Sequence, residues 1–298
     1  MGKRLLKNIA DKALASRWNI GFIDFDPNNF LKQDELKIYW MKHTYKDRWF
    51  ADPFILSVHD NTIELLVEEY YDPIRRGRIA KLTVDAYNFT LLDNQVVLEL
   101  DSHLSYPAIL EINGEIYVYP ENSEAGCLVL YKYDADACKL ISVSVLNDKP
   151  LTDATITKLF SKSYMFSTQM PNPNNNELGV YLSEQLTGNY ILKDTILFQD
   201  NTARCAGDFF QIENKLYRSA QNCNNGYGKG LVIQEVSSQE GKFSFVEKQC
   251  FYPNSWKWSL GLHTFNVNNK IAVVDGHGYR KPLIGHIVGY IYNLFSKK

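Results

Sequence analysis

A strand–turn–strand unit recurs five times along this chain, and this repeat constrains the fold more than any other feature of the sequence. The units begin with "WFADPF" at Trp49, "HLSYP" at His103, "LTDATI" at Leu151, "ARCAGDFF" at Ala203 and "LGLHTF" at Leu260. Each unit starts with small or polar residues, runs through two strand-like segments joined by an Asn, Asp or Ser turn, and ends on polar residues. A period of about 50 residues with this content is typical of a β-propeller.

Further strand-like segments lie between the units: "GRIAKLTVDAY", "CLVLYKYDA", "LGVYLSEQ" and "GLVIQEVSS". They supply the outer strands that four-stranded blades need. The 19 Tyr and 16 Phe residues also favour strands. We therefore predict an all-β chain folded as a five-bladed propeller of four-stranded blades. A β-sandwich is the alternative, but its turns recur every ~8–12 residues without a long period.

Both ends of the chain are basic, with apolar residues at helical spacing. Residues 1–18 hold five basic residues and one acid, and residues 276–298 hold four basic residues and no acid, so each end carries +4 while the whole chain carries −2. We expect amphipathic helices over 1–20 and 281–298 and the propeller over 21–280. Such helices bind anionic membrane surfaces, although packing on each other or on the propeller explains the pattern equally well.

Other features narrow the location and the partners. The net charge of −2 gives no reason to expect a nucleic-acid partner. The five Cys residues lack metal-type spacing, and the N-terminus lacks a signal-peptide pattern, so we expect a cytoplasmic protein, peripheral on the inner face of the membrane if the basic ends bind there. His103, His263 and His277 can approach one another, but no close-spaced ligand pair is present, and no metal or cofactor is expected.

The repeat also predicts where functional side chains gather. In an antiparallel hairpin the start of the first strand and the end of the second lie at the same edge, so the polar ends of all five hairpins should meet at one mouth of the central channel. Glu68 and Glu69 lie on opposite faces of a strand, so one of them points inward. The residues expected in this funnel are Asp52, Glu69, His103, Tyr106, Glu121, Asp153, Arg204, Asp208, Arg218, Gln221, His263 and His277.

The motifs also resemble a known family. "WFADPF", "HLSYP" with "YPEN", "LTDATI", "LYRSAQNC" and "YGKG" resemble, over residues 45–280, the N-terminal domain of glucosamine inositolphosphorylceramide transferases. That domain is similar to the five-bladed propellers of the arabinanase, xylosidase and invertase clan of glycoside hydrolases. The resemblance implies a base or nucleophile at Asp52 and a second Asp, which tunes pKa and positions the sugar, at Asp153.

The resemblance fails at one position. The clan places its general acid, a Glu, at the start of the fourth hairpin, where this chain has Arg204. Glu121, Glu69 and Asp208 are alternatives for the acid, and Glu121 completes the expected catalytic set. An Arg suits phosphate binding, which favours a glycosyltransferase-type enzyme of cell-surface polysaccharide or glycolipid synthesis that binds a sugar or sugar phosphate. A glycoside hydrolase and a non-catalytic glycan-binding subunit of a partner glycosyltransferase are the alternatives.

Overall fold

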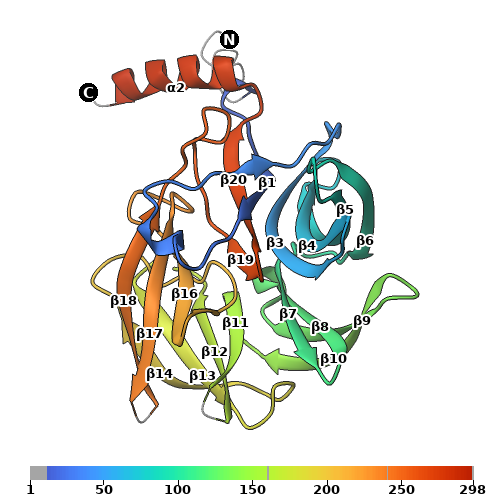
Figure 1. The fold of residues 1–298 in the computed structure, drawn as a ribbon, viewed down its shortest axis with the longest axis vertical. Helices are drawn as coiled ribbons and strands as arrows, with labels where there is room; N and C mark the ends of the chain where they lie inside the picture. The colour runs from blue at the N-terminus through green and yellow to red at the C-terminus, as the bar shows by residue number, and fades with distance from the viewer. Residues whose placement is uncertain (1–11, 160, 240, 297–298) are drawn as a thin grey trace.

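The computed structural model describes residues 12–159, 161–239 and 241–296. Within them, strands form five four-stranded antiparallel sheets arranged around a common centre (Figure 1). The prediction of an all-β, five-bladed propeller is confirmed, and each of the five predicted hairpins forms the two inner strands of one blade. Two single-turn 3-10 helices (Phe30–Lys32 and Ser123–Ala125) and the helix α2 (Pro282–Ser296) complete the fold.

Blades I to V contain the strands as follows. Blade I is β3 (Arg48–Val58), β4 (Thr62–Tyr71), β5 (Arg76–Asp85) and β6 (Leu91–Leu98); blade II is β7 (Ser105–Ile112), β8 (Glu115–Glu121), β9 (Leu128–Asp134) and β10 (Lys139–Asn147). Blade III is β11 (Leu151–Leu159), β12 (Lys162–Gln169), β13 (Glu177–Ser183) and β14 (Ile191–Leu197); blade IV is β15 (Phe210–Ile212), β16 (Lys215–Gln221), β17 (Leu231–Gln239) and β18 (Lys242–Phe251). Blade V is β19 (Phe265–Asn268), β20 (Ile271–Tyr279), β1 (Ser16–Asp24) and β2 (Tyr39–Trp40).

Blade V joins the two ends of the chain and closes the ring. β1 pairs antiparallel with β20 from Ser16↔Tyr279 to Asp24↔Ile271, although the strands lie more than 200 residues apart in sequence. The N-terminal helix predicted over 1–20 therefore ends too late, because residues 16–20 belong to a strand whose Trp18, Ile20 and Phe22 are buried. Residues 1–11 lie outside the described part of the chain.

The core lies between neighbouring blades and holds their inner strands in place. Between blades IV and V, Phe30, Phe210, Phe251 and Phe265 form one buried aromatic cluster, with Phe30 stacked on Phe265 at 4.9 Å between ring centroids. Burying each such side chain contributes roughly 1.5–3 kcal/mol. This packing makes the inner strands a rigid frame for the groups at the channel mouth.

The helix α2 follows β20 and projects beyond the propeller (Figure 1). It packs on Tyr279 through two glycines, since a Cβ at Gly285 would come within 2.2 Å of the Tyr279 ring and one at Gly289 within 2.7 Å of the Tyr279 hydroxyl. The predicted helix over 281–298 is present over the described residues of that range. No helix in the described part of the chain has the length and hydropathy needed to cross a membrane.

Candidate functional site: a ring of carboxylates at the channel mouth

Three inner strands carry the same β-bulge at the channel mouth. The pairing register shifts after Ala51 in β3, after Ser105 in β7 and after Thr152 in β11, so Asp52, Tyr106 and Asp153 occupy equivalent positions. Their φ angles are 49°, 43° and 47°, in the left-handed region that residues other than Gly rarely adopt. Each costs of order 1–3 kcal/mol, so the surroundings must stabilise this backbone.

Carboxylates of neighbouring blades supply that stabilisation. The Asp52 amide donates to Asp275 Oδ2 of blade V, the Tyr106 amide donates to Asp52 Oδ2 of blade I, and the Asp153 amide donates to Glu121 Oε2 of blade II, each at 3.0 Å. In blades I, II and III, the bulge amide is thus bound by a side chain of the preceding blade around the propeller. We call Asp52, Glu68, Glu121, Asp153 and Asp275 the carboxylate ring; all five are buried.

On one side of the ring, Arg204 and Gln221 bind Asp153. Arg204 Nε lies 2.5 Å from Asp153 Oδ2, and Gln221 Nε2 donates to the same oxygen at 2.6 Å. Arg204 Nη1 donates to Asn174 Oδ1 at 2.8 Å, and its Nη2 lies 3.6 Å from Glu121 Oε2. Burial lowers the pKa of Arg204, but Asp153, Tyr227 and Glu121 outweigh it and raise that pKa. Three guanidinium nitrogens are therefore already engaged by the protein.

On the other side, His263 forms an ion pair with the ring. His263 Nδ1 lies 2.6 Å from Asp275 Oδ2, and His263 Nε2 lies 3.8 Å from Asp52 Oδ1. Burial lowers the pKa of His263, but Asp275 and Asp52 raise it above its usual value. Burial raises the pKa of Asp275, but His263 and the hydrogen bonds from backbone amides outweigh burial and lower this pKa below its usual value. Asp275 is therefore the ionised partner of this pair.

The remaining acids of the ring have raised pKa values. Burial, opposed by His263 and reinforced by Asp153, raises the pKa of Asp52 to about 6. Burial and then Asp153, opposed by Arg204, raise the pKa of Glu121 to about 8. Burial and the carboxylates Asp52 and Glu121 raise the pKa of Glu68 well above its usual value. At neutral pH the same ring therefore holds an ionised Asp52 and a protonated Glu121, which is the division of roles an acid–base pair requires.

The inward member of the Glu68–Glu69 pair is Glu68, so the choice of Glu69 for the funnel is wrong. Glu69 Oε1 lies 3.1 Å from Arg48 Nη1 and 2.6 Å from Arg78 Nη2 in blade I. Glu68 instead lies among the ring acids, with Oε1 3.3 Å from His103 Nε2. His103 thus contacts the rim of the ring, as expected, and is partly exposed.

Arg218 and Tyr106 were also expected in the funnel, but their side chains point elsewhere. Arg218 is fully buried against the rings of Phe198 and Phe245 and donates to the carbonyls of Thr202 and Ala203, so its assignment to the funnel is wrong. Tyr106 contributes its amide, while its hydroxyl bonds Thr155 Oγ1 at 2.8 Å.

Asp208 and His277 lie further from the ring acids. The Asp208 amide donates to Asn266 Oδ1 at 2.8 Å, and burial raises the pKa of its carboxyl to about 7. His277 stacks on Trp18 at 4.5 Å, and burial and His263 lower its pKa to about 4. Both therefore flank the site.

Tyr227 covers the ring, although it was not among the residues expected in the funnel; it lies in the Gly-rich segment "NNGYGKG" (residues 224–230). Gly226 and Gly228 have φ angles of 111° and 60°, and the segment between them brings the Tyr227 ring to 4.9 Å from the Arg204 guanidinium and 5.2 Å from the His263 ring. Tyr227 is 43% exposed, so it presents one aromatic surface to solvent directly over the charged groups. Aromatic surfaces of this kind stack on the apolar faces of sugars. Trp18, stacked on His263 at 4.0 Å, was also missed.

One group in the ring has the composition of a metal site. Asp52, His263 and Asp275 offer ligand atoms that lie within 4.8 Å of one another. However, Asp275 Oδ1 accepts the amides of His263 and Thr264, and Oδ2 accepts the Asp52 amide and contacts His263 Nδ1. A metal would have to displace these bonds, so the residues fit an ion pair better than a metal site.

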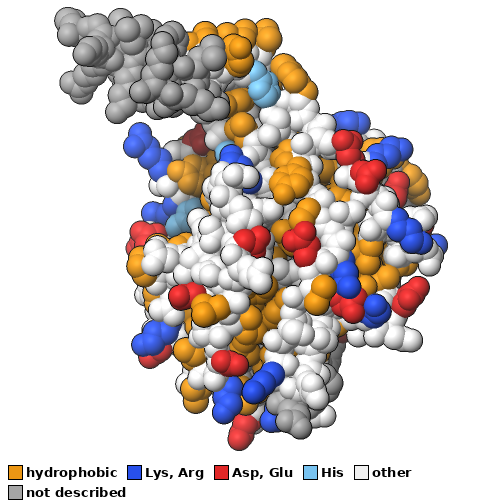
Figure 2. All heavy atoms as spheres, turned by 90° about the vertical axis from the view of Figure 1, so that its left-hand side faces the viewer, with side chains coloured by type: hydrophobic (Ala, Val, Ile, Leu, Met, Phe, Trp, Pro, Cys, Tyr) orange, Lys and Arg blue, Asp and Glu red, His pale blue; other side chains and the backbone are white. Residues whose placement is uncertain are grey.

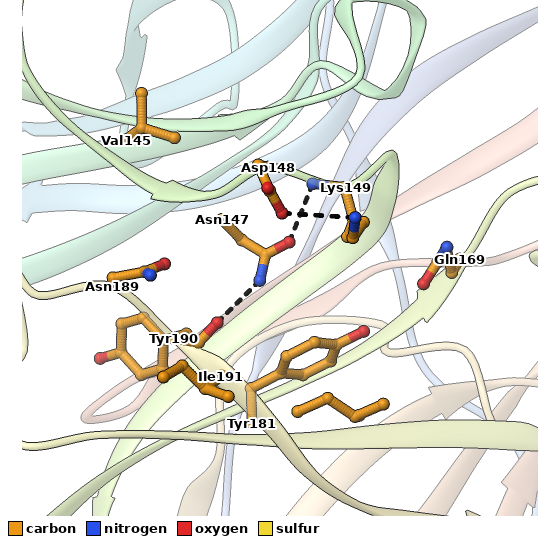
Figure 3. A pocket seen from close by; sticks show the side chains of 10 residues that line it. Val145, Asn147, Asp148, Lys149, Gln169, Tyr181, Asn189, Tyr190 and Ile191 are labelled. Carbon is orange, nitrogen blue, oxygen red and sulfur yellow. Dashed lines mark hydrogen bonds and ion pairs between the residues drawn. The ribbon is translucent and has the colours of Figure 1, made fainter.

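A separate cavity lies between blades II and III (Figure 3). It has a volume of about 550 Å³, and its lining includes Lys149, Gln169, Tyr181 and Tyr190. Asn147 bridges it by donating to the Tyr190 carbonyl at 2.7 Å. None of the ring acids lines this cavity.

Comparison with known proteins agrees with this geometry. Residues 39–276 match the family model described as "Glucosamine inositolphosphorylceramide transferase 1, N-terminal". The chain belongs to this family. Glucosamine inositolphosphorylceramide transferase 1 of Arabidopsis thaliana is 28% identical over 264 residues, covering 81% of this chain and 34% of that protein. The protein of the same name from Oryza sativa subsp. japonica is 27% identical over 199 residues, covering 64% of this chain and 27% of that protein. The chain thus spans about a third or less of these relatives.

Solved structures similar to this member of the glucosamine inositolphosphorylceramide transferase N-terminal family include glycoside hydrolases. The β-xylosidase RS223 has a TM-score of 0.55 at 12% identity, covering 72% of this chain and 80% of that one. Zg3597, a family 117 glycoside hydrolase of Zobellia galactanivorans, has a TM-score of 0.52 at 10% identity, covering 90% and 92%. At these identities the likeness shows the shared propeller fold alone.

Proposed function

We propose that this protein is a carbohydrate-active enzyme that breaks or forms a glycosidic bond at the carboxylate ring. One observation carries the proposal: within a single buried cluster, the pKa of Asp52 is raised to about 6 and that of Glu121 to about 8. Glycosidic chemistry uses one ionised and one protonated carboxyl group around the reacting bond. Glu121 would protonate the leaving oxygen, and Asp52 would act as base or nucleophile.

Asp153 would position the substrate and set the pKa of its neighbours. Its carboxylate is held by Arg204 and Gln221, its amide binds Glu121, and its charge helps to raise the pKa of both Asp52 and Glu121. Tyr227 would provide the surface on which a sugar ring stacks above these groups.

Transfer to a hydroxyl acceptor and hydrolysis by water are two outcomes of the same chemistry. The name of the family favours transfer, in the synthesis of cell-surface polysaccharide or glycolipid, and the fold is shared with hydrolases. A diphosphate leaving group needs charge neutralisation rather than a proton, and three nitrogens of Arg204 are already engaged by Asp153, Asn174 and Glu121. A protonated Glu121 suits a leaving hydroxyl, and a diphosphate leaving group would need cations other than Arg204.

The test is a pair of variants on two kinds of substrate. Purified protein, Asp52→Asn and Glu121→Gln would be incubated with aryl glycosides, oligosaccharides and nucleotide sugars, with products separated by chromatography. Glu121→Gln should lose activity on oligosaccharides yet retain it on aryl glycosides whose leaving group needs no proton, whereas Asp52→Asn should lose both. Glycan binding without turnover of any substrate would instead indicate a non-catalytic subunit of a partner glycosyltransferase.

The surface of α2 supports a second proposal, that the protein attaches to an anionic membrane surface. Leu283, Ile284, Ile287, Tyr290 and Ile291 lie along the side of α2 opposite Gly285 and Gly289, and each is 46–67% exposed. Hydrophobic side chains line the helix at the top of the molecule in Figure 2. The exposed cations Lys257, Arg280 and Lys281 lie at the base of this helix. Apolar stripes flanked by cations bind anionic lipid surfaces, which would place the protein on the inner face of the membrane.

A further inference from the structure

A large basic cavity lies between blades V and I, apart from the carboxylate ring. Its volume is about 730 Å³, within the range of small-molecule sites. Seven of its lining residues are Lys or Arg and none is Asp or Glu. The seven cations are Arg17, Lys42, Lys46, Arg48, Lys257, Arg280 and Lys281. We call this the basic cavity.

Most of this positive charge has no carboxylate partner among the described residues. Arg48 is neutralised by Asp47 and Glu69, and Arg17 Nη2 lies 2.8 Å from Asp72 Oδ2. The other five cations form no ion pair within the described part of the chain. A set of unpaired cations around one hollow attracts an anion, because the anion gains several charge-assisted contacts without losing a protein partner.

Two guanidinium groups are held close together at this cavity. Arg17 Nη2 and Arg280 Nη2 both donate to the carbonyl of Lys46, the latter at 3.1 Å. Burial and the nearby Arg280 lower the pKa of Arg17, and burial, Lys257 and Arg17 lower the pKa of His43 to about 4. His43 Nδ1 is buried and has no hydrogen-bond partner among the described residues. Two guanidinium groups held close together, with the unpartnered His43 Nδ1 at the same cavity, are typical of a site that binds an anion.

The walls of the basic cavity are aromatic. Trp49 stacks on Tyr70 at 4.7 Å between ring centroids, and Trp40 lies 5.6 Å from Trp258. Trp18 lines the cavity and also stacks on His263, the partner of the ring acids Asp275 and Asp52. Trp18 therefore contacts both the cavity and a residue that pairs with the ring acids, and the ligand can combine an anionic group with flat rings.

We propose that the basic cavity binds the phosphate group of a phosphorylated carbohydrate substrate. Guanidinium groups bind phosphate oxygens in a bidentate way, and several ammonium groups balance its second charge. Nucleic acid fits less well, because the cations lie around a hollow and do not form an extended stripe along the surface. The proposal deepens the proposed function by naming a phosphate group on its substrate, but phosphate binding itself needs no turnover. The source is either a soluble sugar phosphate or nucleotide sugar, or a lipid whose headgroup carries the phosphodiester.

Direct binding tests the proposal. Soluble probes would be glucose 1-phosphate and UDP-glucose in calorimetry, and the lipid probe would be phosphatidylcholine vesicles with phosphatidylinositol, with phosphatidylserine or with neither in a flotation assay. The test variant is Lys257→Gln with Arg280→Gln, both exposed, and the matched control is Lys139→Gln with Lys270→Gln, which removes two exposed charges elsewhere. We expect the test variant to bind its probe at least about tenfold more weakly than the unmodified protein does. The control should bind like the unmodified protein.

The outcomes separate the two sources and the two proposals. Binding of a soluble probe that the test variant loses identifies a soluble phosphate. Loss of flotation with phosphatidylinositol vesicles but not with phosphatidylserine vesicles of equal charge identifies the phosphorylated lipid headgroup, whereas equal loss with both vesicles reflects general attraction to an anionic membrane and overturns the cavity proposal. No phosphate-dependent binding by the unmodified protein, or equal binding by the test variant, overturns the proposal. An active carboxylate ring without phosphate binding refutes only the cavity, and phosphate binding by a protein without glycosidic activity refutes only the acid–base assignment.

Discussion

Replacing Glu121 by Gln should make the protein more stable at alkaline pH. The pKa of this carboxyl rises from 4.5 to about 8 on folding, chiefly because burial disfavours the ionised form. The folded protein therefore holds the proton more tightly than the unfolded chain, and the free energy of unfolding falls as pH rises from 4.5 to 8. At 1.36 kcal/mol per pKa unit, the full cost above pH 8 is at most about 5 kcal/mol.

Glutamine mimics the protonated acid and removes this cost. Its oxygen can still accept the Asp153 amide, and its amide group can donate to the Ser123 hydroxyl, which now donates to Glu121 Oε1 at 2.9 Å. The variant should therefore match the unmodified protein below about pH 4.5 and become progressively more stable as pH rises above that value, by several kcal/mol at pH 9. Urea unfolding at a series of pH values measures the difference directly.

Glu115 lies on the same strand as Glu121 and serves as a control, because its pKa is shifted in the opposite direction. The Lys132 ammonium group and the Tyr117 hydroxyl lower the pKa of Glu115, so Glu115→Gln should gain nothing as pH rises. A stability difference for Glu121→Gln that is constant with pH, or that turns against the variant at pH 9, would refute the reasoning. It would mean that Arg204 holds Glu121 ionised in the folded protein.

Three further predictions concern function. Asp52→Asn should lower turnover at least about 100-fold while the circular dichroism spectrum and melting temperature stay near normal, because an amide can still accept the Tyr106 amide and contact Thr264 Oγ1; retained turnover would remove Asp52 from the mechanism. Tyr227→Ala should weaken glycan binding about tenfold, whereas Tyr227→Phe should bind normally, since stacking needs the ring alone; calorimetry distinguishes these, and equal affinity of both variants would contradict a stacking role. Ile284→Ser with Ile287→Ser on the exposed side of α2 should reduce flotation with anionic vesicles severalfold, while Ile141→Ser with Val143→Ser on the exposed side of β10 should not; equal flotation of both pairs would argue against α2 as the membrane contact.

Much of the ring was predictable because it depends on hairpin geometry. The starts of first strands and the ends of second strands meet at one mouth in any antiparallel propeller, so Asp52, Glu121 and Asp153 could be placed together from their positions in the repeat. Gln221 followed for the same reason, and the structure places it on Asp153. Tyr227 could not be found in this way, because a seven-residue Gly-rich loop has no periodic signal.

The errors among the funnel residues concern the direction of a side chain. Strand alternation shows that Glu68 and Glu69 face opposite sides, but which side is the channel depends on how β4 pairs with β3 and β5. The same holds for Arg218, which points toward Phe198 and Phe245 although Gln221, on the same strand, reaches the ring. In each case blade packing decides the direction.

The sequence by itself determined the number of blades, the hairpin that begins each one and the edge at which the polar ends meet, because these follow from a repeat of two-residue alternation and turns. Only the tertiary structure decided the rest. It took β1 from the N-terminal region into blade V, brought Trp18 against His263, and set the pKa values of Asp52 and Glu121. The physical reason is that closure, burial and charge proximity are relations between blades, and no single repeat contains them.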